Sequence, residues 1–162
     1  MNIYIRTLTK NDIKSVQEVV TLSWHDTYKQ IIPLDIQKRF LNVTYSGDAL
    51  MERIHHSHFF IAEKDNQMVG FANFSLLDDS GQVELGALYL HPDFKRQGIG
   101  KQLLHRGINH IEGVKEILVH VEKHNKAAQA FYNKMGFAYV KEVHEFFYGY
   151  PIHSVQLILY PF

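Results

Sequence analysis

Residues 88–103 read LYLHPDFKRQGIGKQL, and this stretch decides the fold. An apolar strand pattern passes through a polar turn into Gly98-x-Gly100 and then into a helix. The first turn of a helix leaves backbone N–H groups without intrahelical acceptors, and the helix dipole adds partial positive charge there. Glycine lets a phosphate approach such a backbone closely, and three basic side chains lie beside it: Lys95, Arg96 and Lys101. The stretch predicts a phosphate-binding turn, with an ordinary strand-to-helix connection as the alternative.

Two common phosphate motifs do not fit these positions. The dinucleotide fingerprint G-x-G-x-x-G/A requires Gly or Ala at position 103, where the chain has Leu103. The P-loop requires Gly at position 95 and Ser or Thr at position 102, where the chain has Lys95 and Gln102. A nucleotide-binding domain therefore stays only as a weaker alternative.

Two segments resemble motifs of the GNAT acetyltransferase superfamily. Residues 95–100, KRQGIG, resemble its motif A, [QR]-x-x-G-x-[GA], with Lys95 as the one departure. Residues 125–137, NKAAQAFYNKMGF, resemble its signature N-x-x-A-x-x-[FL]-Y-x-[KR]-x-G-F. From the residues alone, Asn125 can cap a helix that Gly136 ends. Because both motifs occur in the expected order, we expect a GNAT-like fold.

The resemblance implies that an amine attacks the thioester of acetyl-CoA directly. The chain has no cysteine, which excludes a cysteine acyl-enzyme. Tyr132 holds the position of the family's general acid, and a phenol has a pKa close enough to that of a thiol for proton transfer. Glu84 matches the register of a catalytic glutamate that acts through water, and it is the only charge in the apolar run 83–90. A core tyrosine and a solvent-facing glutamate are the structural alternatives.

The resemblance also implies which residues hold the donor and the acceptor. The backbone of the apolar strand would pair with the pantetheine arm, with one N–H near Leu90 facing the reacting carbonyl oxygen. The expected cofactor-binding residues are Leu88, Tyr89, Leu90, Lys95, Arg96, Gln97, Gly98, Ile99, Gly100, Lys101 and Asn125. Trp24, Asp26 and Tyr28, with the aromatic segment 146–150, are candidates for an acceptor cleft. Core packing of Trp24 and a homodimer contact through segment 146–150 remain equally open.

Composition and patterning set the remaining expectations. The chain has 162 residues, 46% of them hydrophobic, which suits one domain over residues 1–162. Lys and Arg number 17, as do Asp and Glu, so we expect neither a nucleic-acid partner nor a membrane surface. The spacing of the 11 histidines does not match a metal motif. The first residues lack a signal-peptide pattern, which predicts a cytoplasmic protein.

Hydrophobic periodicity predicts an α/β chain with a mixed, mostly antiparallel sheet flanked by helices. Apolar spacings of three and four predict helices, whereas alternation predicts strands. The expected order is a strand near 3–5; helices over 13–28, 33–40 and 46–56; strands over 59–63, 68–74 and 83–90; a helix over 98–111; a strand over 117–122; a helix over 125–136; and strands over 139–147 and 155–160.

The sequence therefore predicts an acetyl-CoA-dependent N-acetyltransferase that acts on a primary amine. Polyamines, amino acids, other small amines and peptide N-termini all remain as acceptors. The pattern around Trp24 and Tyr28, followed by Ile32-Pro33, is similar to that of bacterial members that acetylate polyamines. A non-catalytic acyl-CoA-binding or regulatory domain is the alternative from another functional class.

Overall fold

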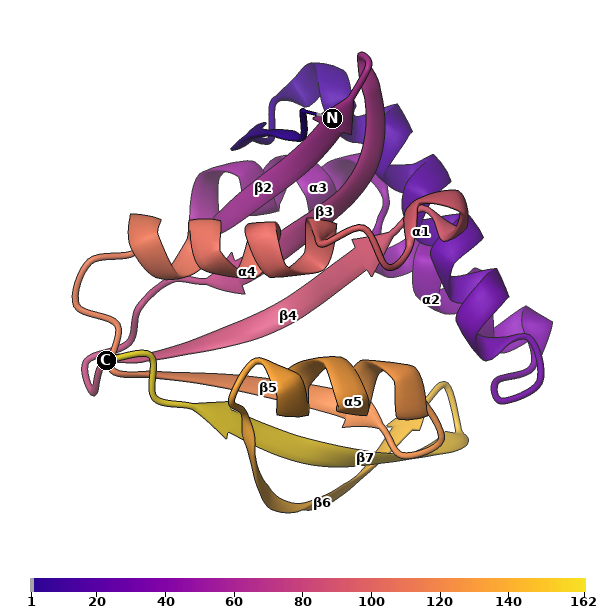
Figure 1. The fold of residues 1–162 in the computed structure, drawn as a ribbon. Coiled ribbons are helices and arrows are strands. Elements are labelled where there is room, and N and C mark those ends of the chain that lie inside the picture. Colours follow the sequence, from indigo (N-terminus) through magenta and orange to yellow (C-terminus); the bar gives the residue numbers. More distant parts are fainter. Residues whose placement is uncertain (1) are drawn as a thin grey trace.

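The computed structural model describes residues 2–162, which form one twisted sheet with helices on both faces (Figure 1). The strands are β1 (Tyr4–Thr7), β2 (Ser57–Lys64), β3 (Gln67–Ser75), β4 (Gln82–Leu90), β5 (Glu116–Glu122), β6 (Ala138–Phe147) and β7 (Tyr150–Leu159). The α-helices are α1 (Ile13–Tyr28), α2 (Leu34–Thr44), α3 (Gly47–His56), α4 (Ile99–His110) and α5 (Lys126–Lys134). The sheet order is β1-β2-β3-β4-β5-β7-β6, and only the β4–β5 pair is parallel. The predicted mixed, mostly antiparallel α/β fold is confirmed.

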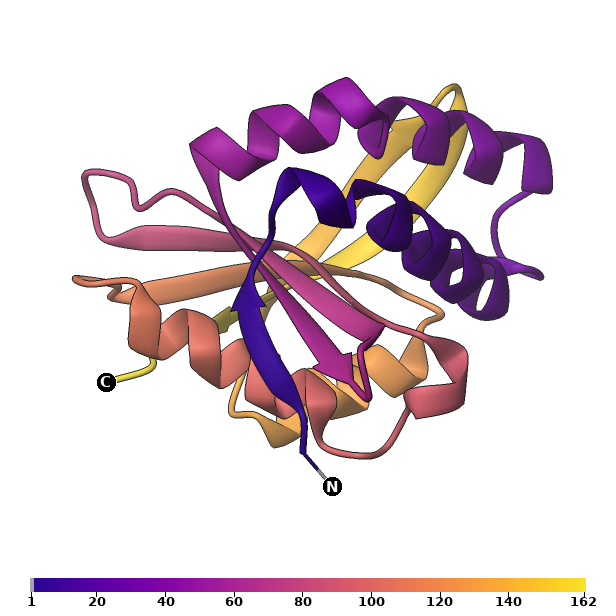
Figure 2. The same ribbon diagram turned by 90° about the horizontal axis from the view of Figure 1, so that it is seen from above.

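The two faces of the sheet carry different helices. Helices α1, α2 and α3 lie on one face, whereas α4 and α5 lie on the other (Figure 2). Phe60, Leu103 and Val119 belong to the core under α4 and α5. Trp24, Phe59 and Phe71 belong to the core under α1 to α3. Successive residues of the central strands, such as Phe59 and Phe60, therefore pack into opposite cores, because side chains alternate between the two faces of a strand.

Local signals fix most element boundaries. The Ser46 Oγ accepts a hydrogen bond from the Ala49 N–H at 3.1 Å and caps α3. The Asn125 Oδ1 accepts a hydrogen bond from the Ala128 N–H at 3.2 Å and caps α5. Gly136 has φ +99° and follows the end of α5. These caps satisfy backbone groups that a helix end would otherwise leave unpaired.

Two predicted boundaries were wrong. Helix α2 continues to Thr44 instead of ending at Phe40. Strand β7 begins at Tyr150 and not at Val155, because residues 150–154, including Pro151, pair with β6. Proline has no N–H to donate, so its presence in the sequence argued against a strand there; in the structure Pro151 lies opposite Phe146 in the β6–β7 hairpin. Within residues 2–162, no helix combines the length and the apolar content that crossing a bilayer requires.

The parallel pair β4–β5 opens the site. The two strands pair only through Gln82–Glu116, Val83–Ile117 and Glu84–Leu118, although both continue beyond these residues. Figure 1 shows them diverging toward the amino-terminal ends of α4 and α5. Opposite, the β3–β4 ladder shifts register so that Asn73 faces Ala87 while Phe74 faces Leu85. Gly86 is the extra residue, and such a bulge bends its strand.

Candidate active site

A cavity of about 650 Å³ lies where β4 and β5 diverge. Because these strands no longer pair with each other there, the facing edges leave backbone N–H and C=O groups free for a ligand. The lining comes from five parts of the chain: Ser23, Thr27 and Tyr28 of α1; residues 85–90 of β4; Lys95, Arg96 and residues 98–101 of the turn and α4; residues 119–121 of β5; and Asn125, Ala127, Ala128, Phe131, Tyr132, Lys134 and Met135 around α5. The cavity thus reaches from the amino terminus of α4 to the face covered by α1.

The amino terminus of α4 forms one end of this cavity. Gly98 precedes the helix with φ +78°, a left-handed conformation that glycine adopts without strain. A Cβ added at Gly98 would meet no atom within 4 Å, so space remains above this turn. A Cβ added at Gly100 would come within 3.3 Å of the Phe131 ring, so the second glycine lets α5 pack against α4. The N–H groups of the first turn of α4 therefore face open space.

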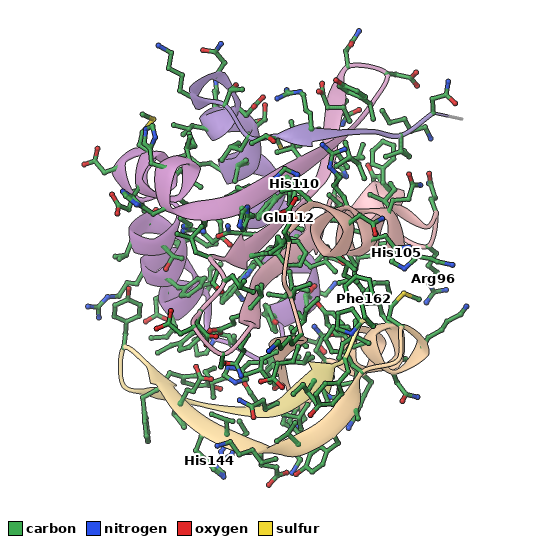
Figure 3. The ribbon with its side chains drawn as sticks, turned by 90° about the vertical axis from the view of Figure 1, so that its left-hand side faces the viewer. Arg96, His105, His110, Glu112, His144 and Phe162 are labelled. Carbon is green, nitrogen blue, oxygen red and sulfur yellow. The ribbon has the colours of Figure 1, made fainter. Side chains whose placement is uncertain are left out.

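The basic residues of the turn take different positions. Arg96 lines the cavity and has φ +63°, which is uncommon for a residue with a side chain. Figure 3 shows Arg96 at the outer end of this turn, with its side chain pointing away from the sheet. Lys95 also lines the cavity, and its Nζ pairs with the Asp26 carboxylate of α1. That contact holds the pKa of Asp26 below its usual range.

Gln97 is the one residue of the predicted turn that does not line the cavity. It is exposed, and its Oε1 accepts a hydrogen bond from Lys64 Nζ at 3.4 Å. The side chain therefore faces the β2–β3 turn instead of the ligand space.

The predicted strand and cap residues do reach the cavity. Leu88, Tyr89 and Leu90 pair with β3 on one edge, opposite Ala72, Phe71 and Gly70, and line the cavity on the other. The Asn125 side chain caps α5 with its oxygen and lies on the far side of the same space. An extended ligand between these walls can pair with a strand edge as an added strand does.

Tyr132 sits at the centre of the cavity wall. It is only 6% exposed, and its ring packs edge-on against Phe131 and Phe137 at centroid distances of 5.1 Å. Burial raises the pKa of the Tyr132 phenol above its ordinary value, and the neighbouring phenols Tyr89 and Tyr28 act in the same direction. The hydroxyl therefore keeps its proton over the physiological pH range and can donate it.

Of the three acceptor candidates on α1, Tyr28 lines the cavity, whereas Trp24 and Asp26 do not. Tyr28 lines the cavity, and burial raises the pKa of its phenol. Trp24 does not line it: the indole is 3% exposed, stacks on Phe40 at 4.3 Å and lies 6.5 Å from Phe147. The core-packing alternative describes Trp24 better, since the ring joins α1, α2 and the β6–β7 hairpin.

The aromatic segment 146–150 divides in a similar way. The Tyr150 hydroxyl donates a hydrogen bond to the Ile31 carbonyl at 2.9 Å, and the Tyr148 ring lies 4.4 Å from the Arg39 guanidinium carbon. The first contact holds the hairpin against the segment that joins α1 and α2, and the second holds it against α2; Figure 2 shows the hairpin reaching this helix layer. Phe146 is the most exposed aromatic side chain of the segment, at 72%, and Tyr148 is 39% exposed.

Glu84 is not brought to the cavity. It lies in the part of β4 that still pairs with β5, opposite Leu118, and it is exposed. Its backbone N–H donates a hydrogen bond to Ser75 Oγ at 2.8 Å. The glutamate therefore stands beside the point where the strands begin to diverge, outside the cavity lining.

The sequence reasoning missed several lining residues, of which His120 carries the most chemistry. His120 lines the cavity from β5, and Ser23 and Thr27 line it from one side of α1. The alternation over residues 117–122 indicated that His120 faces away from buried Val119 and Val121. It could not indicate that β5 leaves β4 at this point, because that divergence is a property of the pairing.

The lining fits a ligand with an anionic end and a long neutral arm. Free N–H groups and a positive helix end at the α4 terminus are suited to bind phosphates. Strand edges and apolar side chains continue from there to Tyr132. This is the shape and polarity of acetyl-CoA, whose pyrophosphate is followed by an amide-containing arm and a thioester.

Comparisons with known proteins agree with this fit. The model of the Acetyltransferase (GNAT) family matches residues 18–137. The spermidine N(1)-acetyltransferase of Thermoplasma acidophilum is 30% identical over 145 residues, which make up 85% of this chain and 89% of that protein. The PaiA N-acetyltransferase of Thermoplasma acidophilum, solved in complex with coenzyme A, has a TM-score of 0.85 and 26% identity over 96% of this chain and 98% of its own.

A further solved structure agrees in fold. The ribosomal-protein-S18-alanine N-acetyltransferase of Escherichia coli has a TM-score of 0.74 at 20% identity, over 98% of this chain and 94% of its own. The family expected from the two sequence motifs is thereby confirmed. Since the family model and a relative each span most of the chain, this protein belongs to the GNAT family of acetyltransferases, and acetyl-CoA is its acetyl donor.

Proposed function

We propose that this chain N-acetylates a small polyamine, with spermidine as the first acceptor to test. The observation that carries the proposal is the match over 145 residues to a protein named spermidine N(1)-acetyltransferase. Two carboxylates lie one side chain away from the cavity and support a cationic acceptor: Asp26 of α1 beside the lining residue Lys95, and Glu145 of β6 beside the lining residue His120. An ammonium group gains from a partly exposed carboxylate, although the gain is modest in water.

The donor would be held by backbone more than by charged side chains. The N–H groups at residues 98–101 would receive the pyrophosphate, and the free edge of residues 88–90 would pair with the pantetheine arm. Asn125 would contact the arm from the α5 side. Bound acetyl-CoA supplies an acetyl group activated as a thioester, and these contacts would orient it toward the acceptor.

Tyr132 would protonate the leaving sulfur. Burial keeps the Tyr132 phenol protonated, and it disfavours a thiolate formed beside the phenol for the same reason. The phenol can therefore donate its proton as the carbon–sulfur bond breaks. Glu84 remains the base expected from the family register, but waters must connect it to the cavity because it does not line it.

An acceptor panel tests the proposal. Purified protein is mixed with acetyl-CoA and spermidine, spermine, putrescine, butylamine, an amino acid or a short peptide, and release of free thiol is followed. We expect kcat/KM for spermidine to exceed that for butylamine by about tenfold, the effect of one additional favourable contact of about 1.4 kcal/mol. Mass spectrometry of the product identifies the acetylated nitrogen.

The control is acetyl-CoA without amine, which gives the rate of hydrolysis. A preference for the amino acid or the peptide would overturn the polyamine assignment while leaving acetyl transfer intact. Tight binding of coenzyme A without amine-dependent thiol release would instead favour a non-catalytic acyl-CoA-binding domain. A single domain over residues 1–162 and a cytoplasmic location stay predictions from the sequence.

A further inference from the structure

His120 lines the cavity from the part of β5 that has separated from β4. It is on β5, two residues beyond Leu118, the last residue of that strand paired with β4. The side chain lines the cavity and is 34% exposed, so a ligand or water can reach the imidazole. The adjacent residues Val119 and Val121 point into the opposite core.

Two polar side chains lie beside the imidazole, one from the adjacent strand β7 and one from β6 beyond it. Its Nδ1 lies 3.7 Å from Glu145 Oε1 on β6, and its Nε2 lies 3.0 Å from Gln156 Nε2 on β7. When the Gln156 amide nitrogen donates in this contact, the His120 Nε2 accepts. The ring proton is then on Nδ1, on the side of the Glu145 carboxylate.

In this arrangement the His120 ring is neutral and could act as a base. Its Nε2 lone pair, which lies beside the neutral amide of Gln156, is the position that would accept a proton. The Glu145 carboxylate lies beside the other ring nitrogen, Nδ1. Imidazole is the side chain best suited to gain and lose a proton near neutral pH.

We propose that His120 is a catalytic base that removes a proton from the acceptor ammonium, directly or through one water, and that Glu145 and Gln156 are positioning residues for its ring. The proposal rests on the acetyltransferase activity and adds a residue to it. It does not require that the acceptor be spermidine.

The protons balance as follows. The acceptor ammonium gives one proton to His120 Nε2, which passes it to solvent, and the free amine nitrogen forms a bond to the acetyl carbon. The carbon–sulfur bond breaks, and the electron pair stays on sulfur. The nitrogen loses its second proton as the amide forms, and the sulfur gains one from Tyr132, whose phenolate recovers the proton that the nitrogen lost.

The surrounding charges distinguish His120 from Glu84. Glu145 faces the imidazole from β6, and Gln156 faces it from β7 without a charge. Glu84 on β4 and Glu122 on β5 carry further carboxylates, but neither lines the cavity, and Glu122 is paired with His124. The phenols of Tyr28 and Tyr89 line the same cavity. Among the titratable side chains of this lining, His120 is the imidazole.

A pH series tests the role. In His120→Gln, we expect kcat at pH 7 to fall by about 100-fold, the lower range for loss of a general base. The loss should shrink toward about threefold near pH ~10, where an alkyl ammonium releases its proton to solvent unaided. Coenzyme A affinity should change by less than about twofold. In His120→Ala, added imidazole should restore part of the rate.

His144→Gln is the matched control. His144 is on β6 next to Glu145 but faces the outside of the sheet, where Figure 3 shows it at the edge of the molecule. Its rate should equal that of the wild type at every pH. Glu145→Gln should give a smaller loss than His120→Gln and move the acidic limb of the pH profile, which a purely structural role would not do.

The results separate this proposal from the choice of acceptor. The panel decides which amine is used, whereas the ratio of His120→Gln to wild type is measured with whichever amine is fastest. A loss of less than about twofold, or a loss of the same size at all pH values, would overturn the role of His120. A pH-dependent loss in Glu84→Gln but not in His120→Gln would assign the base to Glu84.

An NMR titration gives a readout that does not depend on turnover. The imidazole signal of His120 in the coenzyme A complex should shift when an accepted amine is added, and an unchanged signal would contradict the proposal.

Discussion

The two halves of the cavity are built in different ways. The donor half, around Gly98 and Tyr132, comes from two continuous segments, residues 88–101 and 125–135, and much of its binding surface is backbone. The proposed acceptor half is lined by side chains of α1 and β5, with Glu145 of β6 and Gln156 of β7 beside His120 and with Trp24 packed in the core. A continuous backbone segment leaves a sequence signature, whereas a surface assembled from separate elements does not. The donor half could therefore be recognised in the sequence and the acceptor half could not.

Trp24→Ala should have the largest effect, and on stability. Removing a buried aromatic ring costs about 3–5 kcal/mol. The indole holds α1, α2 and the β6–β7 hairpin together, so the acceptor half should loosen first. Urea unfolding measures the loss, and Trp24→Phe, which keeps a ring in the stack, should lose less. A loss below about 1 kcal/mol would mean that the stack does not support this half.

Tyr132→Phe should have the next largest effect, and only on catalysis. Loss of the proton donor should lower kcat by about 100-fold, equal to about 2.7 kcal/mol, with coenzyme A affinity nearly unchanged. Steady-state rates and calorimetric titration with coenzyme A separate the two quantities. Tyr139→Phe, at a residue 63% exposed on β6, is the control and should behave as wild type. Equal losses in both variants would remove Tyr132 from the mechanism.

Gly98→Ala should weaken donor binding through the backbone alone. A left-handed residue with a side chain is strained by about 1–2 kcal/mol, so coenzyme A affinity should fall by about tenfold as the turn changes shape. Gly47→Ala is the matched control, because a Cβ meets nothing within 4 Å at either site and only Gly98 has positive φ. If both variants bind coenzyme A like wild type, the α4 turn is not the phosphate site.

Substitutions in the Lys95–Asp26 ion pair should have the smallest effect, and they should change the affinity for coenzyme A in opposite directions. Lys95→Gln should weaken coenzyme A binding by about twofold, whereas Asp26→Asn should strengthen it by about twofold, since an exposed ion pair is worth at most about 1 kcal/mol. Because Lys95 lowers the pKa of Asp26, the effect of Asp26→Asn should persist through neutral pH and disappear in acid. Both effects should shrink in high salt. Weakening by both variants would show that the pair positions α1 instead of competing for phosphate.

Much of the fold followed from local patterns. The helix over residues 13–28 and the hairpin of β2 and β3 have the periodicity and turn residues of their elements, and both were predicted. The start of β7 was not, because Pro151 has no N–H and only pairing with β6 places it in a strand.

The cavity residues likewise differ in how far the sequence could predict them. Gly98, Asn125 and Tyr132, which line the cavity, could be predicted because each has a local position, as a turn, a cap or a helix residue, that restricts its residue type. His120 was passed over because its neighbours, Glu145 and Gln156, are far from it in the chain. Glu84 was chosen by register, and register along one strand does not report which edge is open.

The sequence by itself determined the family, the acetyl donor and the order of the elements. These depend on glycine conformations, helix caps and apolar periodicity, which act over a few residues. The tertiary structure alone decided where β4 and β5 part, that Trp24 packs in the core, and that His120 reaches the cavity. Those features depend on strand pairing and on packing between distant segments, and neither leaves a local pattern in the chain.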